Sequence, residues 1–579
     1  MPYLASPAPI AARRPPAARK IWDFLAIALV FGFILFLGET SASLIEPLSE
    51  LRLAPVSLDP TSLPWYAART ILRMLAALAL SLLFTFGYAT LAAKSRRAEL
   101  ILIPLLDILQ SVPILGFISI TVVFFMSLAP GKVLGAEFAA VFAIFTSQAW
   151  NMAFSFYQSL RTVPRDLDEA ARSMRLSPWM KFWRLEVPFA VPGLVWNMIM
   201  SMSGGWFFVV ASEAIGVGST TVMLPGIGSY IALAIQQKDL GAICWAIATM
   251  AIAILIYDQL LFRPLVAWAD RFRPEQQSGA QPPTAWVLTV FRRSRLVQQA
   301  AEPLAKLWSA SYRLGAARTG QARQHRAGLR LQWLADGTWL AAIAAAIAYT
   351  LWAAARFIAP DIGHGELAYA VGLALITGLR VVLLIAIASA VWVPVGVLIG
   401  LRADLMRLVQ PVAQFLAAFP ANLLFPLAVV SIVKLQLHPD IWLSPLMILG
   451  TQWYILFNVI AGAAVIPREL LDVGANFRVG GWYWWRRVAL PGVFPYYVTG
   501  AITASGGSLN ASIVAEAVSW GDTRLEAQGI GAYIADATAR GDFQRIVLGI
   551  AVLSALVVVL NRLFWRPLYQ HAEKRFRLD

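Results

Sequence analysis

The sequence predicts an all-α polytopic membrane protein with about twelve transmembrane helices in two tandem six-helix units, and three observations support this class. Of its 579 residues, 59% are hydrophobic and only 14% are charged, whereas soluble domains have about 45–50% apolar and about 25% charged residues. The apolar residues form blocks of about 20, the length that crosses a hydrocarbon core. The second half of the chain also repeats landmarks of the first half. These observations argue against a soluble enzyme.

Twelve hydrophobic blocks mark the expected spans. In the first half they lie near residues 21–38, 67–92, 98–128, 134–159, 189–212 and 240–265. In the second half they lie near residues 336–357, 367–400, 407–435, 441–465, 492–518 and 543–568. Pro104 and Pro113 are expected to kink or break the long third block. The first block follows a basic segment, as in a signal peptide, but its length of about 18 residues favours a retained span.

Basic side chains occur in alternate loops and predict the orientation of the chain. They precede the first span and follow the second, fourth and sixth, whereas the other loops of the first half are acidic or nearly uncharged. The positive-inside rule places the basic loops, and with them both termini, in the cytoplasm. The net charge of +15 is then explained by topology, and we expect no nucleic acid partner.

The repeat is clearest near the end of each half. The run Gly226-Ile227-Gly228-Ser229-Tyr230-Ile231 recurs as Gly529-Ile530-Gly531-Ala532-Tyr533-Ile534, a shift of 303 residues (529 − 226). The same shift relates Glu213 to Glu516, and a shift of 307 relates Arg73 to Arg380. Hydrophobicity alone does not keep glycine, glutamate and arginine in register, so we infer a tandem duplication. Six spans per unit give both units the same orientation.

The expected domain boundaries follow from this repeat. We expect a disordered cytoplasmic tail at 1–20, unit 1 at 21–270, a basic cytoplasmic linker at 271–332 and unit 2 at 333–579. The linker is rich in arginine, and we interpret it as a solvated segment with an amphipathic helix on anionic headgroups. A binding site for a partner is the alternative interpretation of the linker.

The loop after the fourth span has a similar pattern in both units. In unit 1 it reads Glu169-Ala170-Ala171-Arg172-Ser173-Met174-Arg175, then nine residues, then Leu185-Glu186-Val187-Pro188. In unit 2 it reads Asp472-Val473-Gly474-Ala475-Asn476-Phe477-Arg478, then nine residues, then Val488-Ala489-Leu490-Pro491. The pattern resembles the EAA loop of ABC-importer permeases, E-A-A-x-x-x-G followed after nine residues by I-x-L-P. Over about 500 residues the chain is similar to the nitrate/sulfonate/taurine class, in its duplicated form.

The resemblance implies two type I ABC-importer permease units in the bacterial inner membrane. They would form the path of a small anion (nitrate, sulfonate, taurine or similar) that a periplasmic binding protein delivers. The chain has no G-x-x-x-x-G-K-[ST] sequence, so ATP and Mg²⁺ are expected on two copies of a cytosolic ATPase. We therefore expect no catalytic residue and no bound cofactor in this chain. The residues expected to contact the ATPase are Glu169, Ala170, Ala171, Arg175, Asp472, Val473, Gly474 and Arg478.

The two loops depart from the family pattern in ways that affect these contacts. Arg175 and Arg478 stand where the motif has glycine, which allows a turn between two short helices. We expect Ser177-Pro178 and Gly480-Gly481 to supply this turn two residues later. Asp472 also replaces glutamate in the second loop, so we expect the two loops to couple unequally.

The fifth spans are the expected substrate path. Small and polar residues recur there at helical spacing, and close helix packing is their alternative role. In unit 1 they are Asn197, Ser201, Gly204 and Gly205, and in unit 2 they are Ser505, Gly506, Gly507, Ser508 and Asn510. Arg73 and Arg380 are candidate guides for an anion, with snorkelling towards the membrane surface as the competing interpretation.

Glu213 and Glu516 would repel an anion, so we predict that they act as a gate or bind backbone groups. The expected partners are the Gly-Ile-Gly segments, through Gly226, Gly228, Gly529 and Gly531. The same two acids keep a self-sufficient secondary transporter or channel as the alternative function. One cysteine, Cys244, and four scattered histidines do not suggest a metal site.

Overall fold

The computed structural model describes ten segments of the chain: 23–25, 56–217, 220–272, 285–294, 296–299, 302–303, 306–307, 309–310, 329–358 and 362–576. The predicted tail 1–20, most of the first predicted span and most of the linker lie outside these residues. The chain forms two compact units. One comprises Met1–Glu46, Ser155–Ile199 and Ile256–Ala327, and the other comprises Pro47–Phe154, Met200–Leu255 and Gly328–Asp579.

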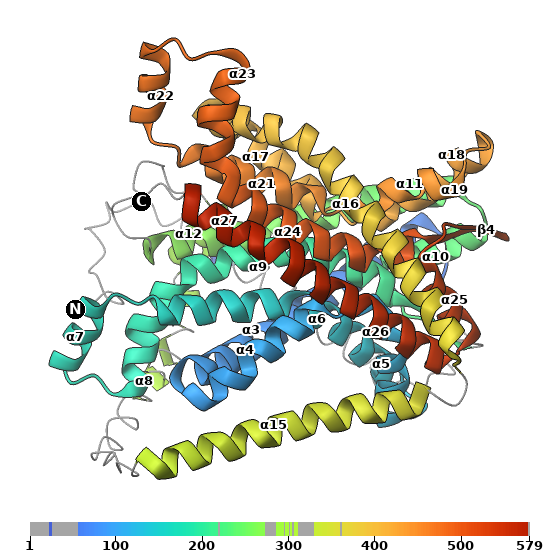
Figure 1. Ribbon diagram of the computed structural model, residues 1–579, viewed down its shortest axis with the longest axis horizontal. Helices are drawn as coiled ribbons and strands as arrows, with labels where there is room; N and C mark the ends of the chain where they lie inside the picture. The colour runs from blue at the N-terminus through green and yellow to red at the C-terminus, as the bar shows by residue number, and fades with distance from the viewer. Residues whose placement is uncertain are drawn as a thin grey trace. The chain divides into compact units, whose positions relative to one another are not determined.

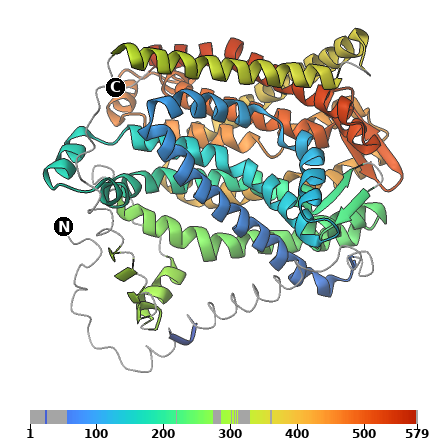
Figure 2. The same ribbon diagram turned by 90° about the horizontal axis from the view of Figure 1, so that it is seen from below.

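The described part of the first repeat is almost entirely helical (Figures 1 and 2). Its elements are η1 (Pro60–Ser62), α3 (Leu63–Lys94), α4 (Arg96–Ser111), α5 (Ile114–Leu128), α6 (Val133–Arg161), α7 (Arg165–Ser173), α8 (Pro178–Lys181), the π-turn η2 (Phe182–Glu186), α9 (Val187–Glu213), β1 (Ala214–Val217), β2 (Thr220–Met223), α10 (Ile227–Gln236), α11 (Leu240–Tyr257), the π-turn η3 (Asp258–Phe262), α12 (Arg263–Ala269) and η4 (Asp270–Phe272). The short helix α13 (Trp286–Arg293) lies in the linker.

The second repeat is built of similar elements. They are α15 (Leu329–Ile358), α16 (His364–Gly400), α17 (Ala403–Ala418), η6 (Ala421–Leu424), α18 (Phe425–Lys434), α19 (Pro439–Trp442), α20 (Ser444–Ile448), α21 (Gln452–Ala464), α22 (Arg468–Asn476), α23 (Gly481–Trp484), the π-turn η7 (Trp485–Ala489), α24 (Leu490–Ala515), β3 (Ala517–Trp520), β4 (Thr523–Glu526), α25 (Ile530–Arg540), α26 (Phe543–Leu560), the π-turn η8 (Asn561–Trp565) and α27 (Arg566–Phe576). From α16 onwards the second repeat follows the order of the first, except that the single helix α6 corresponds to three helices, α19, α20 and α21. Even the π-turns recur at equivalent places, which confirms the duplication.

Seven helices of the described chain are long and apolar enough to cross a membrane, and nine spans result if two bent helix pairs each count as one. The seven lie in α3, α6, the segment ending with α9, the segment from α11, α15, α16 and the segment from α26. The prediction of a polytopic helical membrane protein is confirmed. The count of twelve is not reached among the described residues, because most of the first predicted span lies outside them and two other spans differ from the prediction.

The first difference is the block 98–128, which forms two helices. The expected break at Pro113 is confirmed, whereas Pro104 lies inside α4 and does not end it. Pro113, the residue before α5, has an extended conformation, with φ −65° and ψ 115°, and proline cannot donate the hydrogen bond that would continue a helix. The equivalent break in the second repeat follows Ala418, where the helices Asp404–Ala418 and Ala421–Lys434 meet at 76°. The second difference is α24, which is 26 residues long but whose glycines, serines and Asn510 lower its hydropathy.

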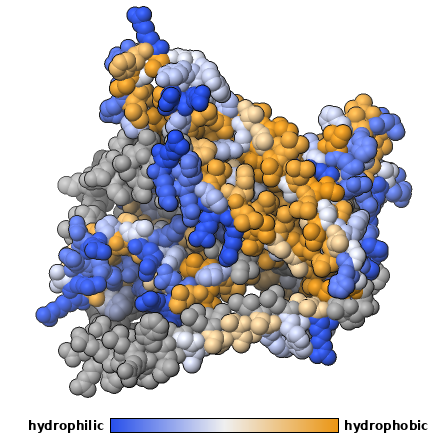
Figure 3. All heavy atoms as spheres, viewed as in Figure 1, coloured by the Kyte–Doolittle hydropathy of each residue, from blue (hydrophilic) through white to orange (hydrophobic). Residues whose placement is uncertain are grey.

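The outward face of α16 is continuous with the apolar surface of the larger unit. Leu375, Leu379, Leu383, Ile387 and Val391 are all more than half exposed. Their spacing of four residues places them on one side of the helix. Hydrophobic side chains cover this area around α16, α24 and α26 in Figure 3. An exposed apolar stripe of this length fits contact with lipid tails and does not fit contact with water.

The inner helices of the second repeat pack closely through glycine. A Cβ atom added at Gly400 of α16 would lie 2.6 Å from the carbonyl oxygen of Ile460 in α21. A Cβ atom added at Gly500 of α24 would lie 2.7 Å from the carbonyl oxygen of Tyr454, also in α21. Small residues therefore bring these helix backbones together, as is common in membrane proteins.

Two small hairpins, which we did not predict, interrupt the helical fold. In the first, β1 pairs antiparallel with β2, with Ala214 opposite Met223. In the second, β3 pairs antiparallel with β4, with Ala517 opposite Glu526. Each hairpin joins the fifth long helix of its repeat to the short helix of the Gly-Ile-Gly segment, α10 or α25. The hairpins therefore fix where these short helices begin.

Candidate functional site

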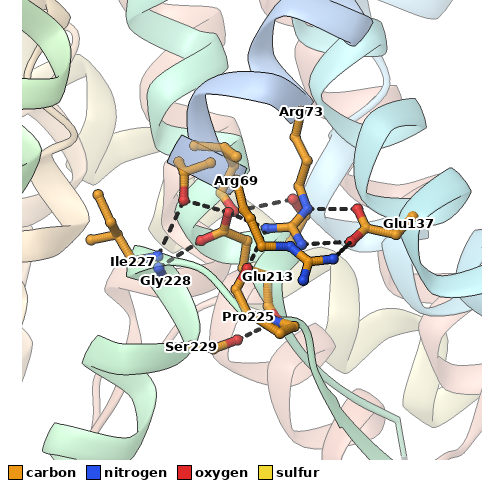
Figure 4. Close-up of polar contacts among 11 residues, drawn as sticks. Arg69, Arg73, Glu137, Glu213, Pro225, Ile227, Gly228 and Ser229 are labelled. Atoms are coloured by element: carbon orange, nitrogen blue, oxygen red, sulfur yellow. Dashed lines mark hydrogen bonds and ion pairs between the residues drawn. The ribbon is translucent and has the colours of Figure 1, made fainter. Parts of the chain in front are cut away.

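Arg73 is the centre of a buried group of charges in the first repeat (Figure 4). Its Nε and Nη2 atoms each donate to a Glu137 carboxylate oxygen at 2.6 Å, and Nη1 donates to Glu213 Oε1 at 2.6 Å. Arg73 is only 3% exposed, and both carboxylates are buried. Arg69 Nη2 lies 3.8 Å from Glu137 Oε1. Two arginines and two glutamates thus neutralise each other, which buried charges require. We call these four residues the first charge cluster.

The Gly-Ile-Gly segment is bound to this cluster through Glu213 and Thr70. Glu213 Oε2 accepts a hydrogen bond from the backbone N–H of Gly228 at 2.7 Å. Thr70 donates to Glu213 Oε1 at 2.7 Å and accepts from the N–H of Ile227 at 3.1 Å. These bonds satisfy two backbone donors at the start of α10 that have no partner within the helix. The first turn of α10 is therefore held against both α3 and α9.

The second repeat has a matching but looser cluster, formed by Arg380, Glu516 and Asp440. Arg380 Nη1 donates to Glu516 Oε1 at 3.0 Å, and its Nη2 lies 3.6 Å from Asp440 Oδ1. Thr377 donates to Glu516 at 2.8 Å and accepts from the N–H of Ile530 at 3.0 Å. Gly531 N–H donates to Glu516 Oε2 at 2.8 Å. We call this the second charge cluster.

Each residue of the second cluster is the repeat equivalent of one in the first, and only Arg69 of the first cluster has no charged equivalent in the second. The shift of 303 converts Glu137 into Asp440, and the shift of 307 converts Arg69 into Ile376. The second cluster thus has one cation for two carboxylates. Sequence reasoning missed Glu137 and Asp440, although their common shift (440 − 137 = 303) was the signal that could have found them.

The glycines of both Gly-Ile-Gly segments are required by close approach, since their backbones are not left-handed. A Cβ atom at Gly226 would lie 2.3 Å from the Glu213 carboxyl carbon, and one at Gly228 would lie 2.4 Å from the carbonyl oxygen of Val210. A Cβ atom at Gly529 would lie 2.2 Å from Glu516 Oε2, and one at Gly531 would lie 2.4 Å from the carbonyl oxygen of Ser512. The predicted contact between these segments and the two glutamates is therefore present in the geometry, while the gating role stays a prediction.

The two hairpins also connect one repeat to the other within the larger unit. The N–H of Gly521, at the tip of the β3–β4 hairpin, donates to the carbonyl oxygen of Ile235 in α10 at 2.9 Å. Next to it, Lys238 Nζ lies 3.0 Å from Asp522 Oδ2. Figure 2 shows both hairpins at the same end of this unit, beside α10 and α25. The tip of the second hairpin therefore holds the end of the first repeat's short helix.

A cavity of about 90 Å³ lies between α9 and the helices of the second repeat, within the larger unit. Its lining residues are Ser203, Gly204, Phe207, Phe208, Phe419, Ala421, Leu446, Met447, Gly450, Thr451, Tyr454, Gly507, Asn510 and Ala511. Gly204 and Gly507 are repeat equivalents, and so are Phe207 and Asn510. No charged side chain lines this cavity, and Asn510 Oδ1 is buried without a hydrogen-bond partner in the described chain.

Some of the predicted path residues line or adjoin this cavity, and the others are buried between packed helices. Asn510 lines the cavity, and Ser508 bonds to the cavity residue Thr451 with 2.7 Å between the hydroxyl oxygens. Ser201 and Ser505 are buried but do not line it. Asn197 donates to Ser155 Oγ at 2.9 Å in the smaller unit. The structure therefore brings only part of the predicted set together.

The EAA-type loops form short helices that end in an unusual way. The N–H of Leu176 donates to the carbonyl oxygen of Ala171 at 3.1 Å, and that of Val479 donates to the carbonyl oxygen of Gly474 at 2.8 Å. These bonds close each helix with a residue in the left-handed conformation, a position usually occupied by glycine. Here the residues are Arg175, with φ 50°, and Arg478, with φ 49°.

The prediction that Ser177-Pro178 supplies the first turn is wrong, because Arg175 itself adopts the left-handed conformation. In the second loop both Arg478 and Gly481 are left-handed, and Gly481 has φ 58°. Gly481 therefore adds a second turn and does not replace the one at Arg478. Ser177 instead caps α8, since its Oγ accepts from the N–H of Met180 at 3.2 Å. The motif position keeps its backbone geometry even though its glycine is absent.

The loop residues predicted to contact an ATPase are not equally accessible. Glu169, Ala170, Asp472 and Val473 are exposed, whereas Ala171 is only 5% exposed and Gly474 is buried. Ala171 therefore packs within its own loop, and Ala170 offers the small surface next to Glu169. The coupling role of all these residues stays a prediction.

A family model described as "Binding-protein-dependent transport system inner membrane component" matches residues 85–263 and 392–577, more than half of the chain. The chain belongs to this family of ABC-importer permeases. The permease thus carries the family domain twice, and each copy includes one EAA-type loop and one Gly-Ile-Gly segment. Thr70, Arg73 and Arg380 lie upstream of the matched ranges, whereas their carboxylate partners lie within them.

Several relatives resemble one part of the permease. The bicarbonate transport system permease protein CmpB of Synechococcus elongatus is 24% identical over 279 residues, which cover 44% of this chain and 94% of that protein. The nitrate import permease protein NrtB of Leptolyngbya laminosa is 25% identical over 176 residues, 30% of this chain and 60% of that protein. The glycine betaine/carnitine transport permease protein GbuB of Listeria monocytogenes is 28% identical over 169 residues, 29% of this chain and 54% of that protein.

Proposed function

We propose that this permease forms, between its two repeats, the translocation path of an ATP-driven importer for a small inorganic anion, with bicarbonate and nitrate as the best candidates. The observation that carries the proposal is the cavity between α9 and the second repeat, to which equivalent positions of both repeats contribute. The printed functions of two relatives, bicarbonate and nitrate transport, supply the candidate substrates.

The size of the cavity favours a substrate with few atoms. About 90 Å³ is less than the ~150 Å³ of a cavity that accepts benzene. Bicarbonate and nitrate each have four heavy atoms and suit this space. Sulfonates and taurine, which the sequence also suggested, are larger and suit it less well.

The chemistry of the cavity lining favours an anion held by neutral donors. Ser203, Thr451, Tyr454 and Asn510 are its polar lining residues, among apolar neighbours. The hydroxyls of Ser203 and Thr451 already bond to Ala417 and Ser508, and an anion would replace these bonds. Neutral hydrogen-bond donors in a low-dielectric site bind a single negative charge without the affinity of a full ion pair. A transport site benefits from this, because the substrate must leave again.

Arg73 and Arg380, which the sequence suggested as guides for the anion, have a different role in this proposal. Arg73 is fully occupied by Glu137 and Glu213, and Arg380 pairs with Glu516. An anion would have to displace these carboxylates to reach either guanidinium. We therefore assign both arginines to the gate that holds the Gly-Ile-Gly segments, and neither to a binding site for the anion.

The proposed topology places the hairpins and charge clusters towards the periplasm and the EAA-type loops in the cytoplasm. Both termini are then cytoplasmic, in the inner membrane, as the basic loops indicate. Residues 21–270 and 333–579 act as the two permease units, joined by the linker. Each loop receives one copy of a separate ATPase, which binds ATP and Mg²⁺, and a periplasmic binding protein delivers the anion.

Reconstitution tests this function directly. The permease is placed in proteoliposomes with its ATPase and binding protein, and uptake of labelled bicarbonate, nitrate and taurine is measured with and without ATP. We expect ATP-dependent uptake of bicarbonate or nitrate, and a loss of at least about tenfold in Asn510→Leu, because a buried polar contact is removed. The matched control is Leu379→Ala on the lipid-facing stripe, which should transport normally.

Two results would contradict the proposal. Uptake at the same rate without ATP would indicate the self-sufficient transporter that the buried glutamates first suggested. Uptake of taurine in preference to both small anions would contradict the argument from cavity size.

A further inference from the structure

Gln148, in the middle of α6, is a buried amide whose hydrogen-bonding groups are poorly satisfied. The residue is 0% exposed, and its Oε1 has no hydrogen-bond partner in the described chain. Among the described residues Nε2 donates only to the sulfur of Met202, at 3.6 Å, and a thioether is a weak acceptor. Replacing such an amide by an apolar side chain of the same shape is close to neutral or stabilising. The amide therefore needs an explanation other than packing.

The repeat equivalent of Gln148 lines the cavity of the proposed path. The shift of 303 converts Gln148 into Thr451 and Gly205 into Ser508. Thr451 is a cavity residue and bonds to Ser508. The corresponding contact exists in the first repeat, since a Cβ atom at Gly205 would lie 2.5 Å from Gln148 Nε2. Gly204, which precedes Gly205 in α9, lines the cavity, so the amide contacts α9 one residue away from the cavity wall.

The two fourth spans differ in shape at this position. In the second repeat the helices Pro439–Ile448 and Gln452–Ala464 meet at 43°, and Thr451 lies in the break between them. In the first repeat α6 continues through Gln148 without a break. Glycine is a poor helix former, and Gly450 in the break has a serine as its equivalent in α6. The bent span thus presents its polar residue to the cavity, whereas the straight span keeps its polar residue buried.

We propose that α6 bends at Gln148 during the transport cycle, as its equivalent does at Thr451, and that the amide then binds bicarbonate and selects it over nitrate. The inference rests on the proposed function, in which a small anion passes through this cavity. A primary amide has an N–H donor beside a C=O acceptor. Bicarbonate offers the complement, an O–H donor beside an oxygen acceptor, so that both groups of Gln148 are satisfied. Nitrate has acceptors only and would leave Oε1 without a partner.

Uptake and thermal stability together test the role of the amide. Gln148→Leu and Gln148→Thr are placed in proteoliposomes with the ATPase and the binding protein, and uptake of labelled bicarbonate and nitrate is measured. Leucine has no polar group, whereas threonine is the residue of the second repeat. The matched control is Thr146→Val, which removes a buried hydroxyl that donates within α6 to the carbonyl oxygen of Ala143 at 2.8 Å. One binding protein is used throughout, so a change in the ratio of the two uptake rates originates in the permease.

We expect Gln148→Leu to lower bicarbonate uptake about tenfold or more and nitrate uptake by no more than about threefold, because only bicarbonate uses both groups of the amide. Since leucine leaves no polar group unsatisfied, this variant should melt at or above the parental temperature. Gln148→Thr should recover part of the bicarbonate uptake, and Thr146→Val should transport at the parental rate.

A cysteine at the same position reports the bend directly. In Gln148→Cys with Cys244→Ser, a water-soluble thiol reagent should react faster during ATP-driven transport than without ATP, because the straight α6 keeps this position buried. Bicarbonate should slow the reaction more than nitrate at the same concentration. Thr451→Cys, in the span that is already bent, is the matched reference and should react without ATP as well.

The inference alone is overturned if Gln148→Leu transports bicarbonate like the parent, or if it loses uptake of both anions equally together with a lower melting temperature. It is also overturned if Gln148→Cys reacts at the same rate with and without ATP. A parent that transports nitrate and no bicarbonate would contradict the selection of bicarbonate and leave the proposed function intact. If the parent transports neither anion, the proposed function fails together with this inference.

Discussion

Arg73 is the residue on which two buried carboxylates depend. Its replacement by glutamine would leave Glu137 with only the more distant Arg69 and would leave Glu213 without a cation. Breaking a buried ion pair on one side costs about 3–5 kcal/mol. We expect Arg73→Gln to lower the melting temperature of the purified permease strongly.

The equivalent change in the second repeat serves as the comparison. Arg380 is more exposed, at 12% of its side chain against 4% for Arg73, and its contacts are longer, at 3.0 and 3.6 Å. Arg380→Gln should therefore cost clearly less than Arg73→Gln. Equal melting temperatures for the two variants would show that the difference between the clusters has no energetic weight.

Replacement of Gly228, whose N–H donates to Glu213, tests the contact between the Gly-Ile-Gly segment and the first charge cluster. Its replacement by alanine would place a methyl group 2.4 Å from the carbonyl oxygen of Val210, so backbone must move and about 1–3 kcal/mol of stability is lost. Gly87 in α3 is the matched control, since nothing lies within 4 Å of an added Cβ atom there. Gly87→Ala should be neutral or stabilising by up to about 1 kcal/mol. Thermal unfolding of both variants checks the prediction, and equal losses would contradict it.

At the scale of elements, each EAA-type loop is stabilised by a different kind of internal contact. In the first loop Lys181 pairs with Asp168 and lies 3.5 Å from Glu186. The equivalents of Asp168 and Lys181 are Leu471 and Trp484, and both of these pack against the hydrophobic core. The first loop is thus stabilised by ion pairs, and the second loop is stabilised by hydrophobic packing.

This difference predicts unequal sensitivity to salt. Raising the salt concentration from 0.05 to 1 M should speed amide hydrogen exchange in α7 by up to about fivefold, because exposed ion pairs are weak and screened. Exchange in α22 should not change, which makes the second loop an internal control. Equal acceleration of hydrogen exchange in both loops would contradict the stabilisation of α7 by the ion pairs of Lys181.

The pH of that measurement follows from Asp168. Lys181 holds the pKa of this carboxyl below its usual value, so the charged form is favoured in the folded loop. This ion pair is fully formed above the usual pKa of about 3.9 and is lost only as the pH falls through the lowered value. Salt effects measured near pH 7 therefore report screening and do not report protonation.

The elements differ in how much of them the sequence could predict. The order of helices, the duplication and the contact between Glu213 and its glycines follow from register, because glycine and glutamate rarely recur in register by chance. Glu137 and Asp440 were missed because a single acid at the start of a span looks like an ordinary loop charge. The left-handed Arg175 was missed because the conformational preference of arginine opposes it, and here the hydrogen bonds of the helix end prevail over that preference.

At the scale of the whole molecule, the contact between Lys238 and Asp522 joins the repeats at the hairpin end. If the repeats must separate there for transport, a covalent link at this place should stop uptake. We expect Lys238→Cys/Asp522→Cys, in a chain with Cys244→Ser, to lose uptake after treatment with a short reducible thiol cross-linker. Reduction should restore it, and each single-cysteine variant is the control. Parental uptake by the cross-linked protein would show that the hairpin end does not open.

The pairing of Phe207 with Asn510 across the cavity has a consequence for how such a site can evolve. In a permease assembled from two identical chains, a mutation at this position changes both walls at once, so the two walls must stay alike. Joining the repeats in one polypeptide removes that constraint. One wall can become aromatic while the other becomes polar, and the site can hold an ion off its symmetry axis, with a defined front and back.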